Sequence, residues 1–157
     1  MDLTVLMSPD EHPHGMDGLS FEALFTASAP VVFVYHGSRW AIHSMIHGRP
    51  NEARFHVRGF IDEGSTTTPF DMVVRNKISR YHLVMDALKY VPRLRSKASD
   101  VTDLMKRKLF EHHAYIREHF EDMPEIALWR WTNDFSESRE PLPLAKGQPR
   151  AQLFTDG

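Results

Sequence analysis

Cysteine is absent from this chain, which excludes disulfide bridges and zinc sites built from thiolates. An excess of positive charge is also missing: 19 lysines and arginines face 21 acids, which argues against a general nucleic-acid-binding protein. No apolar run reaches the length of a membrane span, and the N-terminus has no basic region followed by an apolar core. We therefore expect a cytoplasmic protein with neither a nucleic-acid nor a membrane partner.

The composition suits one globular domain followed by a tail. Of 157 residues, 41% are hydrophobic and 25% are charged, which is ordinary for a globular protein with its own core. Residues 132–157 contain three prolines, two glycines and few large apolar residues, and they show no periodicity. We expect one domain over residues 1–131 and a disordered tail over residues 132–157.

Strands and helices are predicted to alternate in the first half, and helices to fill the second. The run at 31–35 is apolar and mostly β-branched, which is typical of a strand buried on both faces. The other predicted strands are 3–7 and a segment marked by Phe55, Val57 and Ile61. The predicted helices are 20–25 with Ser20 as its cap, 40–47, a segment from 69 that breaks near 76–79, 80–91, and 99 or 100 to about 120. This order favours an α/β fold, a three-layer sandwich with a mainly parallel sheet.

Segment 63–72 carries the best-marked helix start of the chain. Thr68 is predicted as the N-cap, Pro69 as the first helical residue and Asp71 as the acid that completes a capping box. Such a start directs backbone N–H groups and the positive end of the helix dipole toward the preceding loop, which is rich in hydroxyl groups.

Two loops that follow predicted strands form a candidate anion-binding site. Ligands of open α/β sheets bind outside the carboxyl ends of the strands, and parallel neighbouring strands would make these loops converge. An arginine, hydroxyl groups and a helix start would suit a phosphate or a carboxylate. The candidate residues are His36, Arg58, Ser65, Thr66, Thr67 and Thr68. The structural alternative is that the threonines satisfy one another and the helix start, while Arg58 pairs with an acid such as Asp62 or Glu63.

The ten histidines are weaker candidates. His43 and His47 lie four residues apart on a predicted helix, but no third metal ligand is evident. The metallohydrolase pattern would also need a glutamate directly after the first histidine. His12 and His14 flank a proline, where a turn fixed by hydrogen bonds is the simpler interpretation. The residues that we expect on a solvated or half-buried helix face are His112, His113 and His119.

Six blocks of this sequence resemble, in the same order, the C-terminal part of one enzyme family. The blocks are EHPHG at 11–15, PVVFVYHG at 30–37, HVRGF at 56–60, EGSTTTPFDM at 63–72, RYHLVMD at 80–86 and EDMPEI at 121–126. They are similar to segments of the phosphoketolases, which are thiamine-diphosphate enzymes. The resemblance covers residues 2 to 131, and it concerns only the last domain of a much longer enzyme.

The resembled enzymes split xylulose 5-phosphate or fructose 6-phosphate with phosphate, and they release acetyl phosphate and a shorter aldose phosphate. They hold thiamine diphosphate through a divalent metal, Mg²⁺ or Ca²⁺, with a Gly-Asp-Gly stretch that this sequence lacks. Since that stretch belongs to the two upstream domains, the resemblance assigns this chain no catalytic, cofactor-binding or metal-binding residue. It implies a fold like the transketolase C-terminal domain, with a first strand that begins upstream of Asp2 and is truncated here.

Three functional hypotheses follow. The first is a phosphoketolase C-terminal domain with a structural or regulatory role. It would be inactive without its partner, which is either the upstream domains or a separately encoded phosphoketolase chain. The second hypothesis is a non-catalytic module that binds an anion or a nucleotide. The third, a hydrolase that uses the histidines, has the least support. A homo-oligomer is compatible with these hypotheses.

Overall fold

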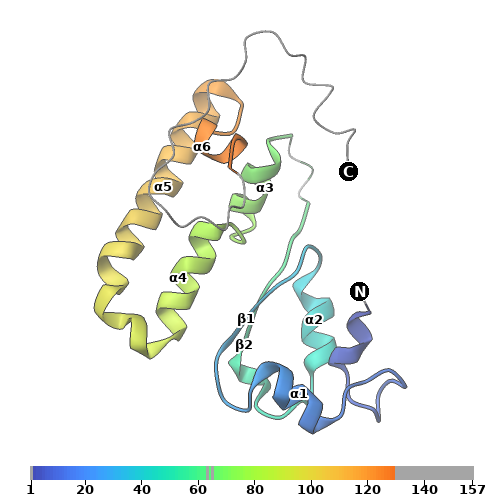
Figure 1. Cartoon of the computed structure of the whole chain (residues 1–157). Helices are drawn as coiled ribbons and strands as arrows, with labels where there is room; N and C mark the ends of the chain where they lie inside the picture. Colours follow the sequence, from blue (N-terminus) through green and yellow to red (C-terminus); the bar gives the residue numbers. More distant parts are fainter. Residues whose placement is uncertain (1, 63, 65, 130–157) are drawn as a thin grey trace. The chain divides into compact units, whose positions relative to one another are not determined.

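The computed structural model describes residues 2–62, 64 and 66–129 (Figure 1). The chain divides into two compact units, and the boundary lies between Asp122 and Met123. The expected tail over 132–157 lies outside the described residues, as does Ser65 of the candidate site. No helix in the described part of the chain is both long and apolar enough to cross a membrane.

The first residues form a helical turn, so the strand predicted at 3–7 is wrong. Leu3–Leu6 is a 3-10 helix (η1) that is capped by Asp2. The Asp2 carboxylate accepts hydrogen bonds from the Thr4 hydroxyl at 2.6 Å and the Thr4 backbone N–H at 2.9 Å. These bonds lower the pKa of Asp2 to about 2. A short acidic side chain thus favours a turn at a segment whose apolar residues alone predicted a strand.

Helix α1 spans Gly18–Phe25 and begins earlier than predicted. Its N-cap is Asp17 and not Ser20. The Asp17 carboxylate accepts hydrogen bonds from the backbone N–H of Ser20 at 3.0 Å and from its hydroxyl at 2.7 Å. Ser20 is therefore a donor in the first turn, because a carboxylate three residues earlier is the better acceptor at a helix start.

Strands β1 (Val31–Val34) and β2 (Phe55–Arg58) pair in parallel, as predicted. The register places Val31 opposite Phe55 and Val34 opposite Arg58. The described residues therefore form an α/β arrangement with a two-stranded sheet, and the larger three-layer sandwich stays a prediction. β1 is not buried on both faces as predicted, since Val34 is 40% exposed.

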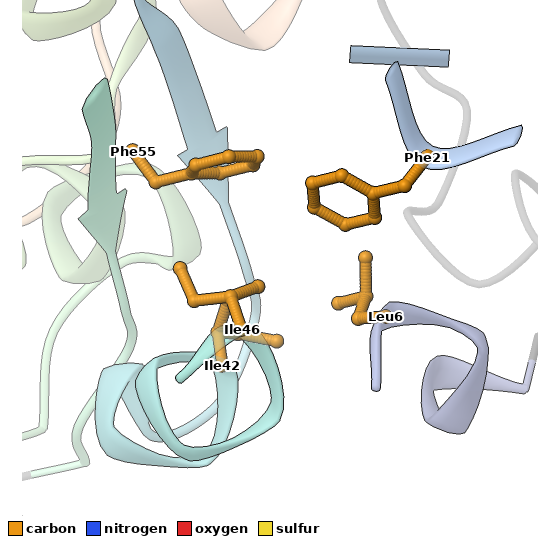
Figure 2. Close-up of a cluster of buried hydrophobic side chains, with 5 residues drawn as sticks. All are labelled: Leu6, Phe21, Ile42, Ile46 and Phe55. Carbon is orange, nitrogen blue, oxygen red and sulfur yellow. The ribbon is translucent and has the colours of Figure 1, made fainter. Parts of the chain in front are cut away.

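One face of the sheet contributes to the hydrophobic core (Figure 2). Helix α2 (Arg39–Ile46) follows β1, and the 3-10 helix η2 (Glu52–Arg54) leads into β2. The fully or almost fully buried side chains come from η1, α1, α2 and β2, and they are Leu6, Phe21, Ile42, Ile46 and Phe55. Because α2 presents two isoleucines one turn apart, it covers the inner sheet face with an apolar stripe.

Two buried arginines connect this core to the loops around it. Arg49 donates hydrogen bonds to the backbone carbonyls of Leu6, Met7 and Met16, and its guanidinium lies 4.3 Å from the centre of the Phe21 ring. Burial lowers its pKa. Arg54 donates to the carbonyls of Phe25, Thr26 and Ala29. Each guanidinium thus satisfies carbonyl groups of irregular segments, which helps to hold η1 and the end of α1 in place.

The second half of the chain is helical, as predicted. Its elements are α3 (Pro69–Arg75), α4 (Arg80–Tyr90), η3 (Pro92–Lys97), α5 (Ala98–His119) and, in the second unit, α6 (Pro124–Ala127). The predicted break at 76–79 is confirmed, and Lys77 there has a left-handed φ of 57°. Helices α4 and α5 pack side by side (Figure 1).

Replacing Ile42 by alanine tests the core. Ile42 is 0% exposed, so Ile42→Ala should lower the free energy of unfolding by about 2–5 kcal/mol through lost burial and a cavity. Urea denaturation at neutral pH measures this change. The matched control is Leu19→Ala on α1, where the side chain is 83% exposed and an effect within about 0.5 kcal/mol is expected. Equal losses in both variants would contradict this description of the core.

Candidate functional site

The loops that follow β1 and β2 converge at the carboxyl edge of the sheet, as predicted. The Tyr35 backbone N–H donates to the Arg58 carbonyl at 3.0 Å, and the Phe60 N–H donates to the Gly37 carbonyl at 2.8 Å. The ring of His36 stacks on that of Phe60, with 4.2 Å between their centroids. Parallel pairing therefore brings His36 and Arg58 to one end of the sheet, although they are distant in sequence.

Glycine is required where these two loops meet. A Cβ atom on Gly59 would lie 2.4 Å from the backbone nitrogen of Arg39 and 2.6 Å from the Gly37 carbonyl oxygen. Neither distance is compatible with a side chain, and both obstacles are backbone atoms that cannot rotate away. The close approach of the loops thus depends on the missing side chain.

Arg58 is engaged by an acid from the helical half of the chain. Its Nε donates to Asp86 Oδ2 at 2.5 Å and its Nη2 to Asp86 Oδ1 at 2.6 Å, in a bidentate pair. The Arg58 side chain is 31% exposed and that of Asp86 is 8% exposed. The hydrogen bonds to Asp86 raise the pKa of Arg58. Arg58 thus pairs with an acid, as the structural alternative expected. That acid is Asp86, which α4 brings close in space, and not Asp62, the described one of the two acids named as examples; Glu63 lies outside the described residues.

Two histidines lie close to this ion pair. His56 on β2 stacks on Tyr90 of α4, with 3.5 Å between the ring centroids. The Nδ1 atom of His82 lies 2.7 Å from the hydroxyl oxygen of Ser79. Burial lowers the pKa of both histidines, and positive charge lowers it further: Arg58 acts on His82, and Lys89 acts on His56. Both imidazoles are therefore neutral at neutral pH.

Sequence reasoning missed Asp86, His82 and Tyr90 as members of this site. All three lie on α4, and the first two also lie in the block at 80–86 that identified the family. Asp86 and His82 are four residues apart and therefore lie on one helix face. That spacing was the signal in the sequence that could have assigned them to one site. Their partner strand could not be inferred from that spacing alone.

The threonine loop leads into the predicted helix start at Thr68 and Pro69, but the Asp71 carboxylate binds the side chains of Thr67, Arg75 and His112 rather than completing the predicted capping box. The Thr68 hydroxyl accepts a hydrogen bond from the Asp71 backbone N–H at 3.2 Å, so its role as N-cap is confirmed. The same hydroxyl donates to Asp122 Oδ1 at 2.5 Å, and the Thr67 hydroxyl donates to Asp71 Oδ2 at 2.7 Å. Thr66 is exposed. Two of the hydroxyl groups that were candidates for an anion thus bind carboxylates.

Asp71 lies at the centre of a buried polar cluster that includes His112. The two side chains are 1% and 0% exposed, and His112 Nε2 lies 3.1 Å from Asp71 Oδ1. Since an ionised carboxylate only accepts, Nε2 carries the proton. Burial alone would raise the pKa of Asp71, but hydrogen bonds from Arg75, Thr67 and His112 outweigh it and lower the pKa. The expectation that His112 is solvated or half-buried was wrong, because a partner in α3 allows its burial.

The remaining histidines do not assemble a metal site in the described part of the chain. No three His, Cys, Asp or Glu side chains form a group there that could hold a metal ion. His43 packs against the ring of Trp40, and His47 lies 3.6 Å from a Glu52 carboxylate oxygen. His12 Nδ1 accepts a hydrogen bond from the His14 backbone N–H at 3.1 Å, which agrees with a turn fixed by hydrogen bonds.

Comparison with known proteins identifies the family. Residues 1–131 match the family described as "XFP C-terminal domain". A probable phosphoketolase of Bradyrhizobium diazoefficiens is 50% identical over 131 residues, which are 83% of this chain and 16% of that protein. A probable phosphoketolase of Brucella abortus is 49% identical over 132 residues, 84% of this chain and 17% of that protein. "Probable phosphoketolase 2" of Nostoc sp. is 48% identical over 131 residues, 83% of this chain and 16% of that protein.

The paired parallel strands and the helices packed against them define an α/β domain. With these matches over most of its length, the chain belongs to the family of phosphoketolase C-terminal domains. It spans only 16% or 17% of the length of the relatives named above. The name phosphoketolase thus describes proteins about six times as long as the matched part.

Replacing Arg58 by alanine tests both the ion pair and the anion hypothesis, which stays a prediction. Arg58→Ala leaves the buried Asp86 carboxylate without its two donors, so the free energy of unfolding should fall by about 1.5–3 kcal/mol. Thermal melts with and without inorganic phosphate test the anion hypothesis. If Arg58 binds the anion, phosphate raises the melting temperature of the wild type more than that of the variant. Equal increases would contradict anion binding by Arg58.

The Asp71 cluster predicts a dependence of stability on pH. The pKa of Asp71 is lowered from its ordinary 3.8 in the folded protein. The ionised carboxylate therefore stabilises the fold above pH 3.8, and this stabilisation is lost as the pH falls toward the lower pKa of the folded state. At pH 7, the free energy of unfolding of Asp71→Asn should be about 1.5–3 kcal/mol lower than that of the wild type. This difference in the free energy of unfolding, measured by urea denaturation, should become smaller below pH 3.8.

The matched control for this comparison is Asp103→Asn on α5, because the Asp103 side chain is 68% exposed and pairs only loosely with Lys106 at 3.8 Å. Its effect should stay within about 0.5 kcal/mol. A constant difference between Asp71→Asn and the wild type from pH 7 to pH 3 would contradict the role of the Asp71 charge.

Proposed function

We propose that this domain is a structural and regulatory part of a phosphoketolase, and that it has no activity without the thiamine-diphosphate-binding domains. The observation that carries the proposal is a match over 131 residues to only 16% of a phosphoketolase. The reaction it would serve is the phosphate-dependent cleavage of a ketose phosphate to acetyl phosphate and an aldose phosphate, in the cytoplasm. Its partner is the upstream part of the enzyme, in the same chain or in a separate one.

We expect no site for the cofactor of the family in this chain. Thiamine diphosphate needs a divalent metal, and the described residues offer no group of three acidic or histidine side chains for one. The Gly-Asp-Gly stretch is absent from the sequence. We therefore derive no catalytic step through the cofactor for this chain.

The polar side chains at the sheet edge support a structural role. The guanidinium of Arg58 is held by both carboxylate oxygens of Asp86, and His56 is stacked face to face on Tyr90. Groups that bind one another in this way fix the position of α4 against β2. A domain with a fixed internal geometry is suited to present a defined surface to a larger enzyme.

Acetyl phosphate formation tests the proposal directly. The chain alone should form none from xylulose 5-phosphate or fructose 6-phosphate, with phosphate, thiamine diphosphate and Mg²⁺ present. Mixing it with a phosphoketolase that lacks its own last domain should restore formation of acetyl phosphate. The truncated phosphoketolase alone and the intact enzyme are the controls. Acetyl phosphate from this chain alone, or no gain in the mixture, would overturn the proposal.

A further inference from the structure

Helix α4 and strand β2 meet along a seam that contains two half-buried histidines. His82, Asp86 and Tyr90 are spaced four residues apart and therefore share one face of α4. His56 and Arg58 are two residues apart and share one face of β2. Tyr90 stacks on His56, and Asp86 binds Arg58, so the two rows of side chains face each other. We name these five residues the α4–β2 seam.

A proton added to His82 would disturb a buried hydrogen bond. The Nδ1 atom of His82 lies 2.7 Å from the hydroxyl oxygen of Ser79, which is only 1% exposed. A buried hydroxyl needs an acceptor for its proton, and Nδ1 of the neutral ring is the acceptor that the described residues offer it. Because a protonated ring donates from both nitrogens, the Ser79 proton would lose this acceptor.

The charges around His82 also oppose its protonation. Burial of the ring is the largest cause that lowers its pKa, and Arg58 of β2, Lys77 before α4 and His113 of α5 lower it further. Asp86 acts in the opposite direction. Both oxygens of that carboxylate already accept hydrogen bonds from Arg58, so a guanidinium compensates its negative charge.

His56 is in a similar environment beside Tyr90. One face of its ring is covered by the Tyr90 ring, with 3.5 Å between the centroids. Lys89 lies close to the same stack, since its Nζ is 4.9 Å from the centre of the Tyr90 ring. Burial is the largest cause that lowers the pKa of His56, Lys89 lowers it further, and Asp86 opposes them. The closed seam thus disfavours a proton on either histidine.

We propose that the α4–β2 seam is a proton-sensitive latch, which holds α4 on the sheet at neutral pH and releases it in mildly acidic solution. The closed seam keeps both histidines neutral, whereas an open seam exposes them to water, where they take up protons at their ordinary pKa of 6.5. Acid therefore favours the open state by mass action. This inference is independent of the function proposed above, because every group that it uses lies in this chain.

The direction of the pH dependence follows from the lowered pKa values. Both histidines have pKa values below 6.5 while the seam is closed. Their contribution to stability is therefore complete above pH 6.5, and it is lost as the pH falls through 6.5 toward the lower values of the closed seam.

Hydrogen exchange of the full chain of 157 residues tests the release of α4. Exchange is followed by mass spectrometry at pH 7 and at about pH 5.5, with correction for the pH dependence of intrinsic amide exchange. Peptides from α2 are the internal reference, because α2 packs in the core and lies outside the seam. In acid, the protection of α4 should fall about three- to tenfold more than that of α2, since one pKa unit is a tenfold change in an equilibrium constant. Equal changes in both helices, or none, would overturn the latch.

A double substitution removes both titrating rings. His82→Gln keeps an acceptor for the Ser79 hydroxyl, and His56→Phe keeps a flat ring on Tyr90, so the contacts of the neutral seam are retained. The additional loss of α4 protection in acid should disappear in this variant. His47→Gln is the matched control, because the His47 side chain is 80% exposed and lies outside the seam, and it should behave like the wild type. A folded double variant whose α4 responds to acid as the wild type does would overturn the proposal.

NMR titration of the imidazole resonances in the wild type tests the latch even if the double variant does not fold. We expect His56 and His82 to titrate below pH 6.5. A pKa at or above 6.5 for either histidine would overturn the proposal, because a proton would then bind to the closed seam as readily as to the open one.

Discussion

Arg58 and Asp86 form the ion pair through which the parallel sheet holds the helical half of the chain. The pair spans 28 residues and joins the last residue of β2 to the middle of α4. Because both carboxylate oxygens are engaged, it fixes the orientation of α4 as well as its distance from β2. The stacking of His56 on Tyr90 adds a second contact between the same two elements. The contact of α4 with α5 then places the longest helix.

The buried Asp71–His112 pair has a similar role within the helical half. It connects α3 to α5 across 41 residues, while Thr67 and Arg75 occupy the remaining oxygen of the carboxylate. A buried carboxylate is stable only when its oxygens are bound, and three donors satisfy this requirement here. The polar groups that suggested chemistry in the sequence are therefore used to join elements of the fold.

Local signals predicted the helices well and the contacts poorly. The N-cap at Thr68 and the break at 76–79 depend on residues that touch within one or two turns, so their chemistry is visible in sequence. The turn at Leu3–Leu6 was missed because one acidic side chain, Asp2, decided between two conformations of a short apolar run. His112 was misjudged because its burial depends on Asp71, far away in the chain. Likewise, the partner of Arg58 was sought among neighbouring acids and is Asp86.

By itself, the sequence determined the alternation of elements, the parallel pairing of two strands and, through six ordered blocks, the family to which the chain belongs. These depend on periodicity, on caps and on residue identities that act over short distances. Only the tertiary structure decided which charges are paired and which histidines are buried. The reason is physical: burial and ion pairing depend on distances between segments that are remote in the chain, and those distances exist only after the elements have packed.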